Sequence, residues 1–196
     1  MSLYLRFLEE FETAGLTTVS SDELAARGGT TSAQVRKDLS FFGSFGKRGL
    51  GYQVAELTKS MRRILGLERD WRVIIVGVGK IGAALAQYDG FRQRGFRVVR
   101  LYDADAAKIG REVDRLSVRA IDALAEDNRE RPVDIAVIAV PASAAQRVVD
   151  QVVAAGISGI LSFAPIQLHV APHVTLNTVN MAMELERLSF ALSNRE

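Results

Sequence analysis

The sequence predicts an α/β protein in which a small helical unit precedes a larger parallel β-sheet. Three short helical patterns fill residues 2–42, whereas from Trp71 onward β-branched runs alternate with helical stretches. Continuous apolar runs separated by helices are typical of a parallel sheet that helices cover on both faces. With 196 residues, of which 48% are hydrophobic, the chain can bury the core that this architecture needs.

Composition excludes several classes of protein. The chain has no cysteine, which excludes disulfides, thiol catalysis, thiol-based redox sensing and cysteine-ligated zinc. No apolar run is long enough to span a bilayer, and residues 1–12 lack the pattern of a secretory signal, so we expect a cytoplasmic protein that does not bind membranes. The formal net charge is only +2, so a nucleic-acid partner has to be argued from where the charges lie.

The first two helices show clear boundaries. Residues 2–14 carry an apolar stripe at helical spacing, and the pattern ends at Gly15. Ser20 and Glu23 fit a capping box for a second, short helix over residues 22–26. Short helices that follow one another through tight turns are typical of a helix-turn-helix unit.

A third helix displays polar donors to solvent. Thr31 or Ser32 can cap it, and it runs to about Phe42. On a helical wheel its apolar residues Val35, Leu39 and Phe42 face inward. The opposite side carries side chains that can donate hydrogen bonds to base edges and phosphates. They are Gln34, Arg36, Lys37 and Ser40.

Four glycines in nine residues follow this helix and flank the basic pair Lys47 and Arg48. We expect a two-stranded ribbon with this pair at its tip, because small neighbours let a basic tip enter a narrow minor groove. A further helix over residues 55–65 and a linker over residues 67–70 end the unit. Residues 36–63 include seven basic and two acidic side chains, so the stretch favours DNA binding over the alternative of an ordinary solvated face.

Beyond the linker, five short apolar runs predict strands. They cover residues 73–76, 98–102, 135–140, 157–163 and 174–178. Helical stretches separate them, which is the pattern of successive βαβ units. A final helix over residues 181–192 carries one apolar stripe.

A glycine loop, GVGKIG at residues 77–82, follows the first of these strands and opens an alanine-rich helix. Gly77 permits the tight turn, Gly79 lets the backbone approach a pyrophosphate, and Gly82 lets the helix lie close to the strand. The helix N-terminus also offers free N–H groups to phosphates. This context predicts a Rossmann-type dinucleotide-binding domain, the alternatives being a loop kept for close helix contact or a site for another nucleotide.

Asp103 indicates which dinucleotide is bound. It ends the second strand, 21 residues beyond Gly82, where a carboxylate can accept hydrogen bonds from both hydroxyls of the adenosine ribose. A carboxylate there also repels a 2′-phosphate. We therefore expect NADH and NAD+ as ligands in preference to NADP(H).

Other chemistries find less support. His169 and His173 stand four apart, but Pro172 between them disfavours the helix that would bring them together, so we expect no metal. About 90 residues follow Asp103, enough to finish the sheet and one helix but not a separate substrate domain, so we expect no enzyme. A regulator that senses coenzyme A or NADP(H) remains an alternative.

Residues 34–43, QVRKDLSFFG, and residues 45–52, FGKRGLGY, resemble the DNA-binding domain of the Rex redox-sensing transcriptional repressors. The resemblance continues through the glycine loop, residues 140–141, residues 163–165 and residues 188–190. It therefore covers nearly the whole chain, and several separate motifs occur in the same order.

The resemblance implies a homodimer that binds a palindromic operator when free or loaded with NAD+ and releases it when NADH binds. It implies three parts: an N-terminal winged-helix domain over residues 1–67, a Rossmann NAD(H)-binding domain over residues 68–180, and a C-terminal, domain-swapped dimerisation helix over residues 181–196. The third helix would enter the major groove of the DNA, with the basic tip in the adjacent minor groove.

The resemblance also implies site residues. The DNA-binding set is Ser32, Gln34, Arg36, Lys37, Ser40, Lys47 and Arg48. The cofactor-binding set is Gly77, Val78, Gly79, Lys80, Ile81, Gly82, Tyr88, Asp103, Val140, Pro141, Ala164 and Pro165. Within it, Tyr88 and the residues from Val140 onward, together with Phe163, match the family's nicotinamide site. NADH would act as an effector, so no hydride acceptor is needed.

Two features depart from the family's pattern. The chain begins within what resembles the first helix, so the extra N-terminal residues of many family members are missing from this sequence. Asn180 stands where many members carry an aspartate that pairs across the dimer with an arginine matched here by Arg6. An amide can form a hydrogen bond but not a full salt bridge. We expect Arg6, Tyr88 and Asn180 to form the switch between the two states.

Overall fold

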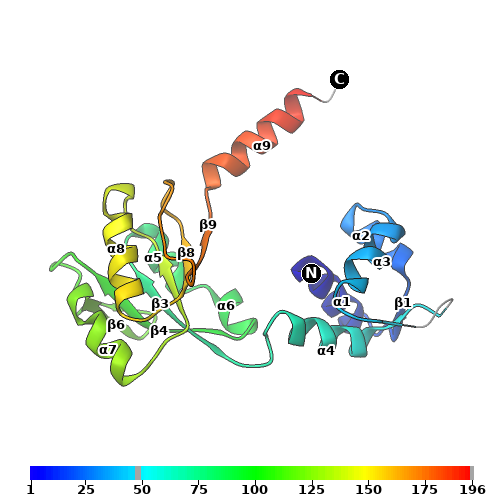
Figure 1. Ribbon diagram of the computed structural model, residues 1–196, viewed down its shortest axis with the longest axis horizontal. Coiled ribbons are helices and arrows are strands. Elements are labelled where there is room, and N and C mark those ends of the chain that lie inside the picture. Colours follow the sequence, from blue (N-terminus) through cyan, green and yellow to red (C-terminus); the bar gives the residue numbers. More distant parts are fainter. Residues whose placement is uncertain (47–49, 195–196) are drawn as a thin grey trace. The chain divides into compact units, whose positions relative to one another are not determined.

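The computed structural model describes residues 1–46 and 50–194 and separates into two compact units (Figure 1). The N-terminal unit is Met1–Arg69 and the second unit is Asp70–Glu196. Each has a hydrophobic core of its own. The predicted basic tip, Lys47 and Arg48, lies outside the described residues.

Within its described residues, the N-terminal unit contains four helices and two very short strands. These are α1 (Ser2–Thr13), β1 (Thr18–Val19), α2 (Ser21–Gly28), α3 (Ser32–Ser40), β2 (Tyr52–Gln53) and α4 (Val54–Ile64). The four helices confirm the four that the sequence predicts, with ends that differ by one or two residues. Their apolar faces meet in a single core that includes Leu5, Leu8 and Met61.

Local side-chain caps set where α2 and α3 begin. Ser20 and Glu23 form the predicted capping box, in which Oγ of Ser20 accepts from the N–H of Glu23 at 3.1 Å and a carboxylate oxygen of Glu23 accepts from the N–H of Ser20 at 2.7 Å. Thr31, rather than Ser32, caps α3, because its Oγ1 accepts from the N–H of Gln34.

In the described residues, the second strand of the predicted ribbon pairs with a segment that precedes α2, and the middle of the ribbon lies outside the described residues. β2 pairs antiparallel with β1, with Val19 opposite Tyr52, and residues 41–46 form no strand. Val19 and Tyr52 are both buried in the core of this unit. The pairing therefore joins the segments before α2 and before α4, a long-range contact that the local sequence does not reveal.

The second unit contains a seven-stranded sheet in the order β5-β6-β4-β3-β7-β8-β9. The strands are β3 (Trp71–Val76), β4 (Phe96–Asp103), β5 (Glu112–Val113), β6 (Leu116–Ala120), β7 (Ile135–Ile138), β8 (Gly159–Ser162) and β9 (Thr175–Thr178). All neighbours are parallel except β5 and β6, which form an antiparallel hairpin. Without β5, the order is that of a Rossmann fold, which confirms the predicted fold class.

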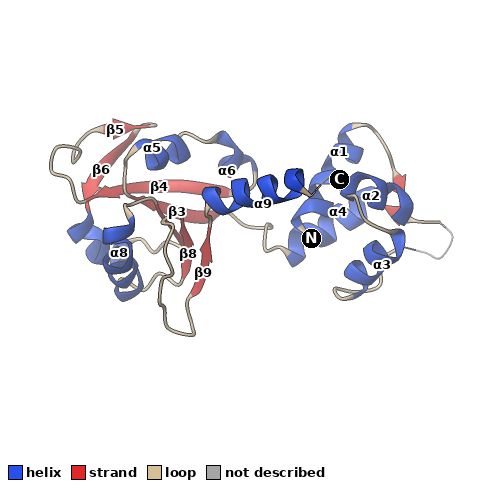
Figure 2. Cartoon of the chain, turned by 90° about the horizontal axis from the view of Figure 1, so that it is seen from above, coloured by secondary structure: helices blue, strands red, loops and turns tan. Residues whose placement is uncertain are grey.

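Helices cover both faces of this sheet, as Figure 2 shows. They are α5 (Lys80–Ala86), α6 (Asp89–Gln93), the short 3-10 helix η1 (Ile121–Ala123), α7 (Leu124–Glu130) and α8 (Ala142–Ala154). One core places α7 and α8 against residues such as Ile74 and Tyr102, and the other places α5 against Ile75 and Leu101. Strand β6 was not predicted, because its apolar and polar residues alternate at the sheet's margin instead of forming a continuous run.

The last helix, α9 (Met181–Ser193), buries none of its residues. Its exposed apolar side chains are Met181, Met183, Leu185, Leu188, Phe190 and Leu192. Met181, Leu185, Leu188 and Leu192 form one stripe, and Met183 and Phe190 lie on the opposite side of the helix. Exposed apolar residues in such number are typical of a surface that another chain covers. The exchange of α9 between subunits stays a prediction. None of the described helices combines the length and apolar character needed to cross a membrane.

Candidate functional site

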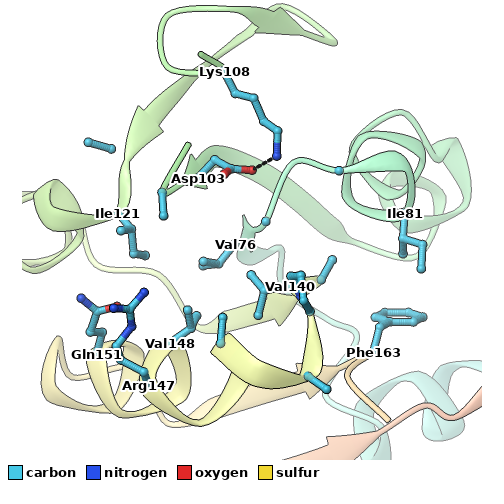
Figure 3. A pocket seen from close by; sticks show the side chains of 18 of the residues that line it. Val76, Ile81, Asp103, Lys108, Ile121, Val140, Arg147, Val148, Gln151 and Phe163 are labelled. Carbon is cyan, nitrogen blue, oxygen red and sulfur yellow. Dashed lines mark hydrogen bonds and ion pairs between the residues drawn. The ribbon is translucent and has the colours of Figure 1, made fainter. Parts of the chain in front are cut away.

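A cleft of about 770 Å³ opens at the carboxyl ends of β3, β4 and β7. The strand order reverses at β3, because β4 lies on one side of it and β7 on the other. In open α/β sheets, ligands bind in the crevice at such a switch point. Figure 3 shows the side chains around this cleft, with Asp103 and Lys108 on one side and Val140 and Phe163 on another.

The glycine loop has the backbone geometry that the sequence predicts. Gly77 adopts φ +95°, a left-handed conformation that favours glycine. A Cβ on Gly82 would lie 1.9 Å from the carbonyl oxygen of Gly77, so only glycine lets α5 approach the loop this closely. A Cβ on Gly79 would meet nothing within 4 Å, which leaves the backbone open towards the cleft.

Asp103 is buried, with 7% of its surface exposed, and three donors hold its carboxylate. Oδ2 accepts from the N–H of Val78 at 2.7 Å and from the ammonium of Lys108 at 2.9 Å, while Oδ1 accepts from the N–H of Asp105 at 2.9 Å. Burial alone would raise the pKa of Asp103, but these hydrogen bonds and the Lys108 charge outweigh it, so the pKa lies below its usual value. Asp103 is therefore an anion at neutral pH.

Most of the predicted cofactor residues line the cleft. They are Gly77, Gly79, Lys80, Ile81, Asp103, Val140, Pro141 and Pro165, joined by Phe163. Val78, Gly82 and Ala164 are buried and do not line it. Tyr88 lies elsewhere: it is 59% exposed, and its ring meets Phe91 edge-on beside a separate cavity of about 180 Å³. Its nicotinamide role stays a prediction.

Sequence reasoning missed several residues of the cleft. Lys108 comes from the loop after β4, Ile121 from η1, and Arg147 and Gln151 from successive turns of α8. Only Lys108 carried a usable signal, because it is a basic residue five positions after Asp103, the acid predicted to bind the ribose. Arg147 and Gln151 reach the cleft because α8 crosses this face of the sheet (Figure 3).

Helix α3 presents the predicted donor face. Val35 and Leu39 are buried, whereas Gln34, Arg36, Lys37 and Ser40 are exposed and Ser32 is half-buried. Phe42 was predicted to face inward but is 49% exposed. The helical wheel fails for Phe42 because α3 ends at Ser40.

Neighbouring side chains orient the donors on α3. The amide of Gln34 donates to Oδ1 of Asp38 at 2.6 Å, and the Tyr4 hydroxyl donates to Oδ2 at 2.7 Å, which ties α3 to α1. The hydrogen bonds from Tyr4 and then from Gln34 lower the pKa of Asp38. Burial, followed by the bond to Asp38, raises the pKa of Tyr4 to about 12. Arg36 donates to the hydroxyl of Ser21 on α2.

The remaining predicted switch residues have partners within their own units. Arg6 lies 3.8 Å from Glu10 and over the ring of Phe7. Oδ1 of Asn180 accepts from the N–H groups of Ala182 and Met183, so Asn180 caps α9. No group of three acidic or histidine side chains that could hold a metal ion occurs among the residues that the structure describes.

Comparisons with known proteins agree with this geometry. Residues 68–166 match the family model described as a CoA binding domain, and residues 1–40 match one described as a DNA-binding protein N-terminus. The redox-sensing transcriptional repressor Rex of Carboxydothermus hydrogenoformans is 48% identical over 190 residues, which cover 97% of this chain and 91% of the relative.

Two solved structures share the fold of nearly the whole chain. The complex of RSP with β-NAD+ and operator DNA has a TM-score of 0.92 and 34% sequence identity, covering 96% of this chain and 87% of RSP. The complex of RSP with β-NADH has a TM-score of 0.88 and 33% identity, covering 96% and 88%. RSP is a Rex-family repressor. On these similarities, the chain belongs to the Rex family of redox-sensing transcriptional repressors.

Proposed function

We propose that this chain represses transcription by binding palindromic operator DNA as a homodimer, and that NADH releases it. One observation carries the proposal: a single chain combines an exposed donor face on α3 with a switch-point cleft that contains Asp103. The named relative, and the RSP complexes with NAD+ and operator DNA and with NADH, support both halves.

The donor set of the cleft fits a dinucleotide. The anionic Asp103 can accept from a hydroxyl of the adenosine ribose. The open backbone at Gly79, with the exposed Lys80 beside it, gives room and positive charge for the pyrophosphate. Val140 and Phe163, with the two prolines of the lining, offer an apolar wall for the nicotinamide.

This apolar wall gives a physical reason why the protein would respond differently to NADH and to NAD+. The nicotinamide ring is a cation in NAD+ and neutral in NADH, and placing a cation against apolar side chains costs desolvation energy. NADH can therefore favour a state of the dimer in which the ring is enclosed. A ligand shifts such an equilibrium only by the difference in its affinity for the two states.

For the DNA, we propose that α3 enters the major groove. Gln34, Arg36 and Lys37 are exposed and can reach base edges or phosphates. The unburied apolar side chains of α9 supply a surface for a second copy. A dimer of two such modules requires two half-sites related by a two-fold axis.

The relatives are transcription regulators, and we propose further that this chain does not consume NADH. The cleft would hold the dinucleotide as an effector, and the protein would act in the cytoplasm, where the operator is. Incubation with NADH and candidate carbonyl substrates should leave the absorbance of the reduced nicotinamide unchanged. Steady oxidation above the rate of a protein-free control would contradict this.

A second candidate ligand is coenzyme A, because residues 68–166 match the CoA binding domain family. Coenzyme A carries a phosphate on its adenosine ribose, however, and the anionic Asp103 disfavours a second negative charge there. NADH is therefore the ligand that we favour.

Fluorescence anisotropy of a labelled palindromic operator tests the proposal. The protein is titrated onto the DNA at fixed salt, and then NADH, NAD+, NADPH and coenzyme A are added separately, because operator affinity depends on ionic strength. NADH alone should release the DNA. An Asp103→Ala variant should bind the operator normally but ignore NADH. Release by coenzyme A alone, or no operator binding in any state, would overturn the proposal.

A further inference from the structure

Lys108 is a partly buried cation at the edge of the cleft. The proposed function gives it no role. Its side chain is 32% exposed, and its ammonium lies 2.9 Å from Oδ2 of Asp103 and 3.9 Å from Oδ2 of Asp105. Figure 3 shows it reaching from the loop after β4 to Asp103 at the edge of the cleft. Lys108 is therefore the cation nearest to the carboxylate that would bind the ribose.

The hydrogen bonds of Asp103 leave too few acceptors for a ribose diol. Each carboxylate oxygen can accept about two hydrogen bonds. Oδ2 already accepts from Val78 and Lys108, and Oδ1 accepts from Asp105, so one position on Oδ1 remains. One ribose hydroxyl can donate to this position. The second hydroxyl needs another partner.

Lys108 can supply that partner. An ammonium carries three N–H donors, and Asp103 takes one of them at hydrogen-bond distance, while Asp105 is too far for a second bond of normal length. A hydroxyl both donates and accepts. A donor and an acceptor side by side therefore match a vicinal diol better than a carboxylate alone does.

We propose that Lys108 is a specificity-determining residue of this cleft: it donates to the adenosine ribose beside Asp103 and limits how strongly the site rejects a 2′-phosphorylated ribose. The inference rests on the proposed function, because it assumes an adenine dinucleotide as ligand. Asp103 repels a 2′-phosphate and Lys108 attracts it. The preference for NADH over NADPH therefore depends on the difference between this repulsion and this attraction.

Other charges in this part of the cleft do not replace Lys108. Asp122 lines the cleft and Asp105 lies 3.9 Å from Lys108, so both add negative charge. Lys80 belongs to the glycine loop, where we place the pyrophosphate, and Arg147 comes from α8, on a different side of the opening (Figure 3). Removing Lys108 therefore leaves acidic groups in excess where the ribose would lie. This should disfavour a phosphate more than it disfavours a neutral hydroxyl.

Isothermal titration calorimetry of the full-length protein with NADH and with NADPH tests the assignment. Four proteins are compared: the unmodified chain, Lys108→Met, Asp103→Asn and the double variant. Arg111→Met is the matched control, because Arg111 is an exposed cation on the same loop that does not line the cleft. Thermal unfolding of each protein without ligand shows whether the second unit is intact.

The Lys108→Met variant should bind NADH about threefold to tenfold more weakly and NADPH more weakly still, so that the preference for NADH rises. In Asp103→Asn, Lys108 loses its anionic partner and becomes available to a 2′-phosphate, so the preference should shift towards NADPH. The double variant should lose that shift. Arg111→Met should change neither affinity.

Equal changes in both affinities for Lys108→Met, or a shift towards NADPH that persists in the double variant, would overturn the role of Lys108. Such a result would mean that Lys108 only holds Asp103 in place. A different failure would concern the proposed function itself: if the unmodified chain binds no NADH, the cleft does not take a dinucleotide. The titration of the unmodified chain separates the two cases.

Discussion

The donor face of α3 and the cleft of the second unit are built in opposite ways. On α3 the donors are exposed, and other side chains orient them, as Asp38 orients Gln34 and Ser21 holds Arg36. In the cleft, backbone groups fix the geometry: two N–H groups hold the buried Asp103. Exposed side chains can adapt to a large, charged partner, whereas a rigid backbone cradle selects one small ligand.

The largest expected difference between the two sites is in how their affinities depend on ionic strength. Each phosphate contact of a DNA-binding face releases counterions, so operator affinity should fall on the order of a hundredfold or more between about 50 and 200 mM salt. The ion pair of Asp103 and Lys108 is partly buried and less screened. NADH affinity should therefore change by less than about fivefold. Anisotropy and calorimetry over one salt series measure both, and equal salt slopes would contradict the distinction.

Two glycine variants should distinguish a glycine that the fold of the loop requires from one that only faces the ligand. In Gly82→Ala the new Cβ would lie 1.9 Å from the carbonyl oxygen of Gly77, which should cost roughly 1–3 kcal/mol of stability. Gly79→Ala should leave stability unchanged, because a Cβ there meets nothing within 4 Å, but should weaken NADH binding. Urea unfolding and calorimetry measure the pair. Normal NADH binding by Gly79→Ala would argue against the loop as the pyrophosphate site.

Removal of single cations from α3 should weaken operator binding and leave NADH binding unchanged. Arg36→Ala and Lys37→Ala should each weaken operator binding by about 1–3 kcal/mol and leave NADH affinity unchanged. Arg129→Ala is a suitable control, because Arg129 is exposed on α7 in the second unit. If the control weakens operator binding as much as Lys37→Ala does, the effect comes from net charge and not from the α3 face.

The smallest effects concern one tyrosine in each unit. Tyr4 donates to Asp38, Tyr102 donates to the buried Asp127, and burial followed by these bonds raises the pKa of each to about 12. Tyr4→Phe and Tyr102→Phe should each cost about 1 kcal/mol at neutral pH.

The sign of the pH dependence follows from the raised pKa. An unfolded tyrosine has a pKa near 10, so each tyrosine stabilises the fold below about pH 10, and its contribution is lost as the pH rises through about 12. Between these values the phenylalanine variants should lose less stability than the unmodified chain. Denaturant unfolding over this range measures the difference. If the free energy of unfolding falls equally in all three proteins, groups other than these tyrosines control the loss of stability at alkaline pH.

The parts of the fold that sequence patterns predicted are those with local causes. The capping box of Ser20 and Glu23 and the glycine loop before α5 depend on residues close in sequence, and both occur where the pattern indicates. Strand β6 was missed because its apolar and polar residues alternate and form no continuous apolar run, and the pairing of β1 with β2 was misassigned because these two strands are distant in sequence. The exposed Phe42 was misread because a wheel assumes that the helix continues.

By itself, the sequence determined the two-part architecture, the position of the glycine loop, the acidic end of β4 and the donor face of α3, because apolar periodicity, caps and glycines act over a few residues. Only the tertiary structure decided that Lys108 meets Asp103, that Asp38 joins Tyr4 to Gln34, and that Arg147 and Gln151 reach the cleft. The contact of Tyr4 with Asp38 and the approach of α8 to the cleft arise when distant parts of the chain come together, whereas Lys108 meets Asp103 because the loop after β4 folds back on the end of that strand. No local pattern encodes their distances.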